Sequence, residues 1–456
     1  MRRYGKLMTF LHKAAALAAH DVWFPGFHAT LARVSATEWA NAEECYALQS
    51  DRLLTMIRFA LRRVPYYRRT AAHIGVDPED IETLFDVAKL PIVTREDVSR
   101  QRMDFLPDGR WLPSDRDCTT SGTSGTPLRY RLSRSDRAIG LALMYRGWGY
   151  AGYRVGDGVV VLAGSSLGAK HGQWHRRLGY PLRNMVKLSA FDMTDKSLDL
   201  YIEQINRMKP MFIRGYPGAV QVLANRVHCR RISVWQPRAV FTTSEILLPA
   251  MRERISGAFG CPVFDGYGLN DGGVSAYECE SHSGLHIDTE RSLLQVVDEQ
   301  GRPLMQGTGR IVATTLTNYA MPLIRYDTGD LAEVDQGSCP CGRTRTLLKR
   351  ICGRSTDILV TPEGKLVHGW FFVFLFRDLS QHVQEFRVVQ ESIRELSILV
   401  IPAEEFHQSV LAKLREAISE LSPGWVVRIQ TVQALPHTVG DKMKFVESKI
   451  GDGGTR

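Results

Sequence analysis

Short apolar segments that alternate with helical segments constrain the fold of this chain more than any other feature. Buried-strand patterns occur at 159–163, 210–215, 239–243 and 263–266, and helical patterns start near 217 and 248. Strands that alternate with helices along a chain form βαβ units, in which neighbouring strands run parallel. The pattern therefore predicts an α/β fold with a largely parallel sheet.

The segments on either side of this region have other patterns. Residues 1–75 repeat apolar side chains at helical spacing, as at Leu53, Ile57 and Leu61. After residue 285, strands at 293–297, 309–316 and 331–334 are separated by turns, which predicts a β-rich subdomain. The remaining residues have the pattern of a small α+β unit. We therefore expect an N-terminal domain, 1–354, that begins with a helical lead-in, 1–75, and a mobile C-terminal domain, 355–456.

The amino-acid composition indicates which kinds of molecule the chain is suited to bind. The chain has 456 residues, 44% of them hydrophobic, and a formal net charge of +9. This charge suits an anionic small ligand such as a nucleotide or coenzyme A, whereas the lack of basic runs and of nucleic-acid-binding motifs argues against nucleic acid. No window reaches the roughly 18 apolar residues of a membrane span. Eight cysteines in so long a chain are typical of a reducing cytoplasm, and the sequence leaves monomer and homodimer open.

A hydroxyl-rich loop stands before a predicted strand at 128–132. Its two glycines let backbone N–H groups approach an anion, and its hydroxyls add donors without bulk, so the loop is typical of a phosphate cradle. No lysine follows the second glycine, which excludes the common P-loop motif. A flexible surface loop is the alternative. The candidate phosphate-binding residues are Thr119, Thr120, Ser121, Gly122, Thr123, Ser124, Gly125 and Thr126.

A different class of enzyme is suggested by Gly164-Ser165-Ser166-Leu167-Gly168. This segment matches G-x-S-x-G, the nucleophile elbow of α/β-hydrolases, and it follows a predicted strand. The sequence supplies no oxyanion-hole motif and no evident Asp and His partners, so a plain turn between strand and helix is the stronger interpretation. A serine hydrolase that uses Ser166 is the alternative from another class.

Three further segments place polar residues where ligands bind. Tyr267 to Gly272 follow a predicted strand, and an aromatic ring with an acid at the carboxyl end of a parallel strand suits a nucleotide and Mg²⁺. Asp330 follows a tight turn and is placed to accept two ribose hydroxyls, or else caps the turn. Lys442 and Lys444 lie in a glycine-containing segment, where a lysine stabilises negative charge or is simply solvated.

Taken in order, these segments resemble the adenylate-forming superfamily of acyl-CoA synthetases, adenylation domains and luciferases. More narrowly, the chain resembles the phenylacetate–CoA ligase branch and its capsule-cluster relatives. The resemblance covers roughly residues 55–450 and rests on seven blocks in the family order: the hydroxyl-rich loop, FTTSE, YGLND, RYDTGD, CPCGR, GRSTD and the terminal lysine. Seven blocks in this order are far more specific for the superfamily than any single block.

The resemblance implies a role for each matching residue. The loop from Thr119 to Thr126 would wrap the β- and γ-phosphates of ATP, and Tyr267 would stack on adenine beside Gly268. Asp271 would hold Mg²⁺, and Asp330 would bind the ribose. The remaining matches are Ser244 and Glu245 beside the adenine, Asn270 near the α-phosphate, Arg354 near the ribose and Asp357 at the hinge of the C-terminal domain.

The sequence departs from the family pattern at two places. The family usually has Thr or Ser followed by Glu where this chain has Asn270 and Asp271, and the shorter side chain puts the Mg²⁺ geometry in doubt. Lys442 matches the lysine that bridges the carboxylate and the α-phosphate, but Asp441 replaces the usual glycine before it. Lys444 therefore competes with Lys442 for the catalytic role.

The implied reaction has two steps. A carboxylic acid attacks ATP to form an acyl-adenylate and pyrophosphate, and coenzyme A then takes the acyl group. Transfer to an amine or hydroxyl, transfer of AMP itself, and an inactive scaffold are alternatives. Aromatic residues near the expected acyl pocket suit an aryl or arylacetic acid, or equally ordinary core packing: Tyr145, Trp148, Tyr216, Phe241 and residues 264–273.

A metal site is the last expectation. Cys339 and Cys341 form only a C-x-C pair, but Cys279 and His286 lie upstream, with His282 between them. Three thiolates and one imidazole make a closed tetrahedral zinc site, which is structural rather than catalytic. Members of the phenylacetate–CoA ligase branch have a zinc site of this kind. Free cysteines in a turn are the alternative.

Overall fold

The computed structural model describes residues 17–435 and 445–450, apart from 19, 23, 110–111, 121–127, 164–179, 191–192, 336, 355–357, 370, 373–374, 377–378 and 380. The chain divides into two compact units, Met1–Leu247 with Met251–Ile351, and Leu248–Ala250 with Cys352–Arg456. None of the described helices has the length and apolarity needed to cross a bilayer.

The first unit begins with helices, as the apolar spacing predicts. Asn41 caps α3 through a reciprocal capping box with Glu44, and Pro65 occupies the first turn of α4, where its missing N–H costs nothing. The buried faces of these helices pack on a cluster that includes Leu316 and Tyr326. The helices of this lead-in are α2 (Phe27–Ala36), α3 (Ala42–Arg63), α4 (Pro65–Ile74), η1 (Pro78–Asp80), η2 (Asp86–Lys89), α5 (Arg95–Arg100) and η3 (Arg102–Phe105).

Eleven described strands of the first unit form one sheet, in the order β10-β11-β12-β13-β9-β8-β7-β6-β5-β3-β4. The parallel half confirms the predicted α/β pattern and comprises β3 (Val159–Ala163), β4 (Met185–Ser189), β5 (Phe212–Gly215), β6 (Ala239–Thr243) and β7 (Val263–Leu269). Six strands continue this sheet on the other side of β7: β8 (Val274–Glu278), β9 (Leu285–Ile287), β10 (Ser292–Val297), β11 (Gly307–Thr315), β12 (Tyr326–Asp335) and β13 (Leu347–Arg354). Strands β10, β11 and β12 match those predicted at 293–297, 309–316 and 331–334.

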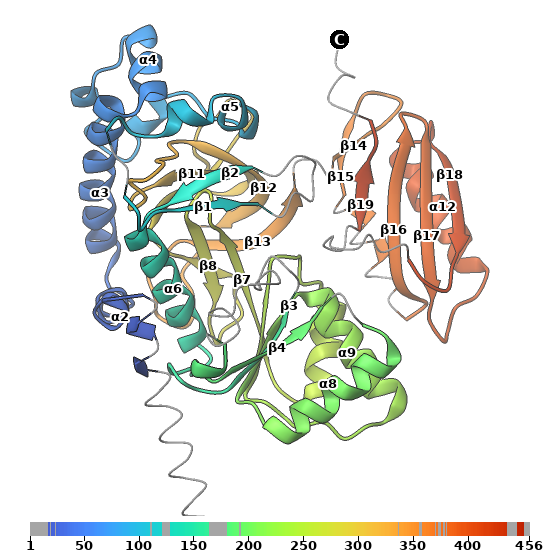
Figure 1. The fold of residues 1–456 in the computed structure, drawn as a ribbon. Helices are drawn as coiled ribbons and strands as arrows, with labels where there is room; N and C mark the ends of the chain where they lie inside the picture. The colour runs from blue at the N-terminus through green and yellow to red at the C-terminus, as the bar shows by residue number, and fades with distance from the viewer. Residues whose placement is uncertain are drawn as a thin grey trace, which may run out of the picture. The chain divides into compact units, whose positions relative to one another are not determined.

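Helices cover both faces of the parallel half (Figure 1). Val160 and Leu162 of β3 pack with α8 (Asp195–Met208), α9 (Pro217–Arg230) and α10 (Pro249–Phe259). Val159 and Val161 face the other way, toward α6 (Arg134–Gly149). Because neighbouring residues of a strand point to opposite faces, strands covered on both faces read as continuous apolar runs.

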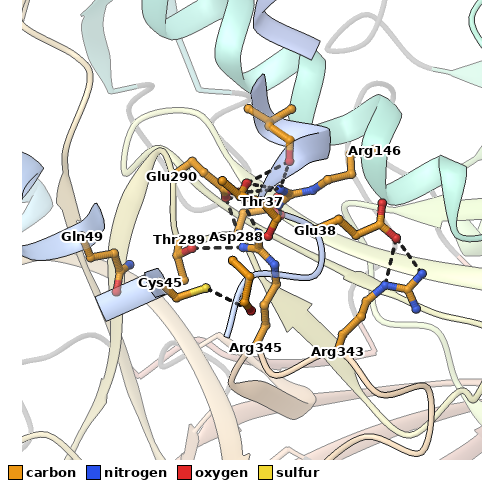
Figure 2. Close-up of polar contacts among 12 residues, drawn as sticks. Thr37, Glu38, Cys45, Gln49, Arg146, Asp288, Thr289, Glu290, Arg343 and Arg345 are labelled. Carbon is orange, nitrogen blue, oxygen red and sulfur yellow. Dashed lines mark hydrogen bonds and ion pairs between the residues drawn. The ribbon is translucent and has the colours of Figure 1, made fainter. Parts of the chain in front are cut away.

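A network of ion pairs and hydrogen bonds lies where the turn after α2 meets residues next to the sheet (Figure 2). Arg146 of α6 bonds to Glu290 at 2.5 Å, and Arg345 reaches the same carboxylate at 2.7 Å. Thr37, in the turn after α2, donates to Glu290 at 2.5 Å, and Glu38 accepts from Arg343 at 2.8 Å. Removing one partner of a buried pair typically costs about 3–5 kcal/mol, because the other charge stays buried and unmatched.

The second unit is a small α+β fold around its own core. Strand β16 (Val383–Ser392) pairs with β17 (Glu395–Pro402), and β18 (Val426–Thr431) and β19 (Val446–Ser448) flank them in parallel. Helix α12 (Ser409–Leu421) buries Val410, Leu414 and Ile418 against this sheet. A separate hairpin is formed by β14 (Ile358–Val360) and β15 (Leu366–His368).

Candidate active site

The hydroxyl-rich loop connects the two strands of a hairpin. Strand β1 (Arg116–Thr119) runs antiparallel to β2 (Arg129–Leu132), with Thr119 opposite Arg129. The N–H of Thr120 donates to the Leu128 carbonyl at 3.0 Å, and the Leu128 N–H donates to the Thr120 hydroxyl at 3.0 Å. These bonds close the base of the loop. Thr119 and Thr120 are placed in this way, whereas the predicted residues Ser121, Gly122, Thr123, Ser124, Gly125 and Thr126 lie outside the described residues.

Arg95 lies beside the base of this loop, and the sequence analysis missed it as a site residue. Its guanidinium donates to the Thr120 hydroxyl at 3.1 Å, and its charge also acts on Asp271. The position follows from two backbone bonds: Val93 N–H to the Arg325 carbonyl, and Asp327 N–H to the Val93 carbonyl, each 2.9 Å. The only feature of the sequence at this position was a predicted helix start at 94–97, and the structure confirms it as the start of α5 (Arg95–Arg100).

Four of the predicted residues come together where β7 ends beside β12. The Tyr267 hydroxyl donates to Asp330 at 2.8 Å, and the Tyr326 hydroxyl donates to Asp271 at 3.1 Å. Burial raises the pKa of the Asp271 carboxyl, and the neighbouring Asp330 raises it further. Asn270 accepts a bond from an arginine, Arg291, at 3.3 Å. Gly268 is exposed in β7, next to Tyr267.

Ser244 and Glu245 follow β6, at the same edge of the sheet. Ser244 adopts a left-handed conformation with φ of 71°, which few residues other than glycine adopt. The Glu245 carboxylate accepts the N–H of Gly218 at 3.0 Å, in the first turn of α9. A carboxylate at a helix N-terminus is favoured by the helix dipole. The edge formed by the carboxyl ends of parallel strands is where open α/β sheets bind ligands.

The predicted metal residues form a cluster. One ligand atom from each of Cys279, His286, Cys339 and Cys341 lies within 4.8 Å of all the others. The sulfurs of Cys279 and Cys339 are 3.5 Å apart, and His286 Nε2 is 3.4 Å from the Cys341 sulfur. Burial and nearby arginines lower the pKa of His286 to about 4, so the imidazole is neutral at pH 7, as a metal ligand must be. His282 bonds to Glu278 instead, at 3.2 Å.

Comparison with known proteins decides the family. The chain is 31% identical to the phenylacetate–coenzyme A ligase of Thermus thermophilus, over 70% of this chain and 72% of the relative. It is 30% identical to the Escherichia coli enzyme of the same name, over 78% of this chain and 82% of the relative. The chain belongs to the phenylacetate–CoA ligase family. The predicted branch of the adenylate-forming superfamily is thereby confirmed.

Three further likenesses include the second unit. Residues 359–449 match the model of the CapK C-terminal domain. Protein CapK of Staphylococcus aureus is 22% identical over 90% of both chains. A crystal structure of 2-hydroxyisobutyryl-CoA ligase in complex with 2-HIB-AMP has a TM-score of 0.73, with 23% identity over 90% of this chain and 91% of that one. The fold expected of a phenylacetate–CoA ligase is therefore present.

Some residues expected from the family pattern are not placed at this site. Arg354 is the last residue of β13 and belongs to the second unit. The hinge candidate Asp357, both candidate lysines, Lys442 and Lys444, and the hydrolase candidate Ser166 lie outside the described residues. Their roles remain predictions from the sequence.

Proposed function

We propose that the chain activates a carboxylic acid with ATP and transfers the acyl group to coenzyme A. A carboxylate oxygen bonds to the α-phosphorus while the bond to pyrophosphate breaks. The coenzyme A thiol then bonds to the acyl carbon, AMP leaves, and the thiol proton is released. The observation that carries this proposal is a connected set of contacts in a chain of the phenylacetate–CoA ligase family: Arg95 bonds to Thr120 and acts on Asp271, and Asp330 bonds to Tyr267 and acts on Asp271.

The geometry supports a division of roles within the nucleotide site. Thr120 and Arg95 lie where the phosphates would bind, since a guanidinium and hydroxyls suit phosphate oxygens. Tyr267 and Asp330 hold each other at 2.8 Å, which suits an aromatic ring on the adenine and a carboxylate on the ribose hydroxyls. Ser244 and Glu245 would border the adenine.

Mg²⁺ fits the residues at this site. Asp271 is a buried carboxylate with a raised pKa, and a bound cation would favour its charged form. Bound Mg²⁺ would neutralise charge on the phosphates. Lys442, or Lys444 in its place, would stabilise the charge that develops as the carboxylate attacks.

We also propose that Cys279, His286, Cys339 and Cys341 bind a structural Zn²⁺. Ligands about 2.0–2.3 Å from a tetrahedral zinc lie roughly 3.5–3.8 Å from one another, close to the separations observed here. The cluster joins the end of β8, strand β9 and the segment 339–341. All eight cysteines are free thiols, which suits the reducing cytoplasm that we propose as the location.

The test is the release of pyrophosphate from ATP across aryl, arylacetic, fatty and amino acids, with and without coenzyme A. Wild type, Lys442→Ala and Lys444→Ala are compared. We expect release that depends on a particular acid and accelerates with coenzyme A. Loss of the catalytic lysine should lower the rate by about 100-fold or more, whereas loss of the other lysine should leave it nearly unchanged.

Other outcomes would point elsewhere. Pyrophosphate release that depends on the acid but does not change with coenzyme A would favour an amide or ester ligase, or transfer of AMP to another acceptor. If no acid causes pyrophosphate release, and the protein hydrolyses esters in a way that is lost in Ser166→Ala, the serine hydrolase would be favoured over the ligase.

A further inference from the structure

The turn between β7 and β8 carries an exposed amide that a buried arginine holds. Asn270 is the first residue of this turn, which spans 270–273, since Leu269 pairs with Val274. Arg291 donates from Nη2 to the side-chain oxygen of Asn270 at 3.3 Å. Arg291 is only 3% exposed, whereas Asn270 is exposed. Because water competes for an exposed amide, this bond adds little to the free energy of unfolding, so we looked for a role in the site.

A carboxylate of α6 fixes the guanidinium of Arg291. Arg291 bonds to Asp136 through Nε at 3.2 Å and through Nη2 at 2.7 Å, a two-point contact that sets the plane of the group. Asp136 is completely buried and also accepts a bond from the Thr317 hydroxyl at 2.7 Å. Gly140, one turn further along α6, leaves room for the arginine, because a Cβ there would lie 2.8 Å from the central guanidinium carbon. The arginine is therefore held in one position.

This arrangement decides which way the Asn270 amide points. An arginine only donates hydrogen bonds, so the atom that faces it must be the amide oxygen. Nη2 of Arg291 has two hydrogens, of which one goes to Asp136 and the other to Asn270. The NH₂ group of Asn270 therefore points away from Arg291. Without the arginine, the amide would populate both orientations, because the terminal torsion of asparagine is broad and roughly two-fold.

Asn270 lies between two residues that the family resemblance assigns to the nucleotide. Tyr267, three residues earlier, is assigned to the adenine, and Asp271, the next residue, is assigned to Mg²⁺. The α-phosphate joins the nucleoside to the outer phosphates of ATP, so its oxygens are the acceptors that an amide at this place would meet. Arg291 and Asp136 form an ion pair that is neutral as a whole. The arginine would therefore act on the phosphate through the amide rather than through a net charge.

We propose that Arg291 is a positioning residue that holds the Asn270 amide so that its NH₂ group donates to the α-phosphate of ATP. A donor that is already oriented stabilises the charge that develops on phosphate oxygens without reorganising during the reaction. This inference rests on the proposed function, since it assigns a role in the same adenylation step. It also explains how asparagine can replace the usual Thr or Ser: a hydroxyl rotates to donate, whereas an amide has one donating and one accepting end.

A double-mutant cycle tests whether Arg291 acts through Asn270. Arg291→Lys keeps a cation beside Asp136 but loses the planar fork that reaches both partners. In acid-dependent ATP–pyrophosphate exchange, it should lower kcat by about tenfold and leave KM for the acid nearly unchanged, and Asn270→Ala should lower kcat by about 100-fold. Adding Arg291→Lys to Asn270→Ala should cause no further loss, because the amide is already gone. If the two losses multiply instead, the proposal is wrong.

A second variant separates hydrogen-bond donation from folding. Asn270→Asp keeps an oxygen facing Arg291 and adds a charge to the contact, but it replaces the donor with a carboxylate that repels phosphate. We expect an unfolding temperature equal to or above that of the wild type, together with a kcat that is lower by about 100-fold or more. Exchange at the wild-type rate in Asn270→Asp would show that no amide donor is needed, and it would overturn the proposal.

A matched control separates positioning from stability. Arg146 is another buried arginine of this unit, and its carboxylate partners are Asp288 and Glu290. Arg146→Lys should lower the unfolding temperature without changing kcat, and a loss of kcat equal to that of Arg291→Lys would overturn the proposal. If Arg291→Lys does not fold, the neutral pair Asp136→Asn with Arg291→Gln replaces it in the cycle. No exchange by the wild type with any acid would remove the proposed function and this inference with it, whereas a failed cycle in an active enzyme would remove the inference alone.

Discussion

At the scale of single residues, Arg95 shows how a short connector contributes to a site. Its neighbours in sequence form only one turn of capped helix, and nothing in that pattern indicates a ligand. Val93 pairs with Tyr326, the first residue of β12, and this places the Arg95 guanidinium next to Thr120, where its charge acts on Asp271. A cation at this point would lower the free energy of bound phosphate oxygens.

Replacement of Arg95 tests this role. Arg95→Met should reduce kcat/KM for ATP in pyrophosphate exchange by about 10- to 100-fold, because a charge-assisted contact to phosphate is lost. Arg95→Lys should retain most of the activity. Arg100 is exposed at the end of the same helix, so Arg100→Met is the matched control and should behave as wild type. Equal losses in both methionine variants would indicate damage to α5 rather than loss of a phosphate contact.

At the scale of elements, the candidate metal cluster of Cys279, His286, Cys339 and Cys341 brings together the end of β8, strand β9 and the segment 339–341. Cys279, His286 and Cys339 are buried, whereas Cys341 is partly exposed. The separation of these residues in sequence leaves a long connection between the two halves of the cluster. A metal that closes this connection restricts the unfolded chain, which raises the free energy of unfolding.

Metal content and stability test the cluster. We expect about one zinc per purified chain, from four protein ligands that complete one tetrahedral site. Cys341→Ser should lose most of the metal and unfold at a lower temperature, as should the wild type after treatment with a strong chelator. Cys229 is an exposed thiol on α9, so Cys229→Ser is the control and should keep the metal. Full stability of metal-free wild type would argue for free cysteines.

At the scale of the whole molecule, two compact units carry the residues of one proposed reaction. The proposed nucleotide-binding residues include Thr120, Tyr267 and Asp330 of the first unit, and both candidate lysines belong to the second unit. The family resemblance implies that the second unit swings between the two steps, which would change the backbone conformation of the connection between the units. Asp357 is the residue that the family resemblance assigns to this connection.

A proline at this position tests the hinge. Asp357→Pro restricts φ to about −65°, so it should hinder a change of backbone conformation. We expect the formation of acyl-CoA to fall at least roughly tenfold more than pyrophosphate exchange, because exchange requires only the adenylating arrangement. Asp357→Ala removes the side chain and keeps the backbone free, and it should affect both reactions little. Equal losses in the two half-reactions of the proline variant would remove Asp357 as the hinge.

The sequence by itself determined much of the fold class and the family. Strand patterns such as 239–243 and 159–163 match β6 and β3, since strands buried on both faces carry continuous apolar runs. The ordered blocks that include Tyr267, Asp271 and Asp330 led to the family, and their local glycines and acids were visible without any structure. The four candidate metal ligands were also visible in the sequence, where the family resemblance joined a C-x-C pair to an upstream Cys and His, and the structure brings their ligand atoms within 4.8 Å of one another.

Only the tertiary structure decided which distant residues meet. The continuation of the parallel strands into the antiparallel half depends on pairing between β7 and β8, and no local pattern specifies that the two halves share one sheet. Arg95 reaches Thr120 at the base of the hydroxyl-rich loop because Val93 forms a bridge to Tyr326 of β12. Such contacts join residues far apart in the chain. They follow from long-range packing, which local propensity does not encode.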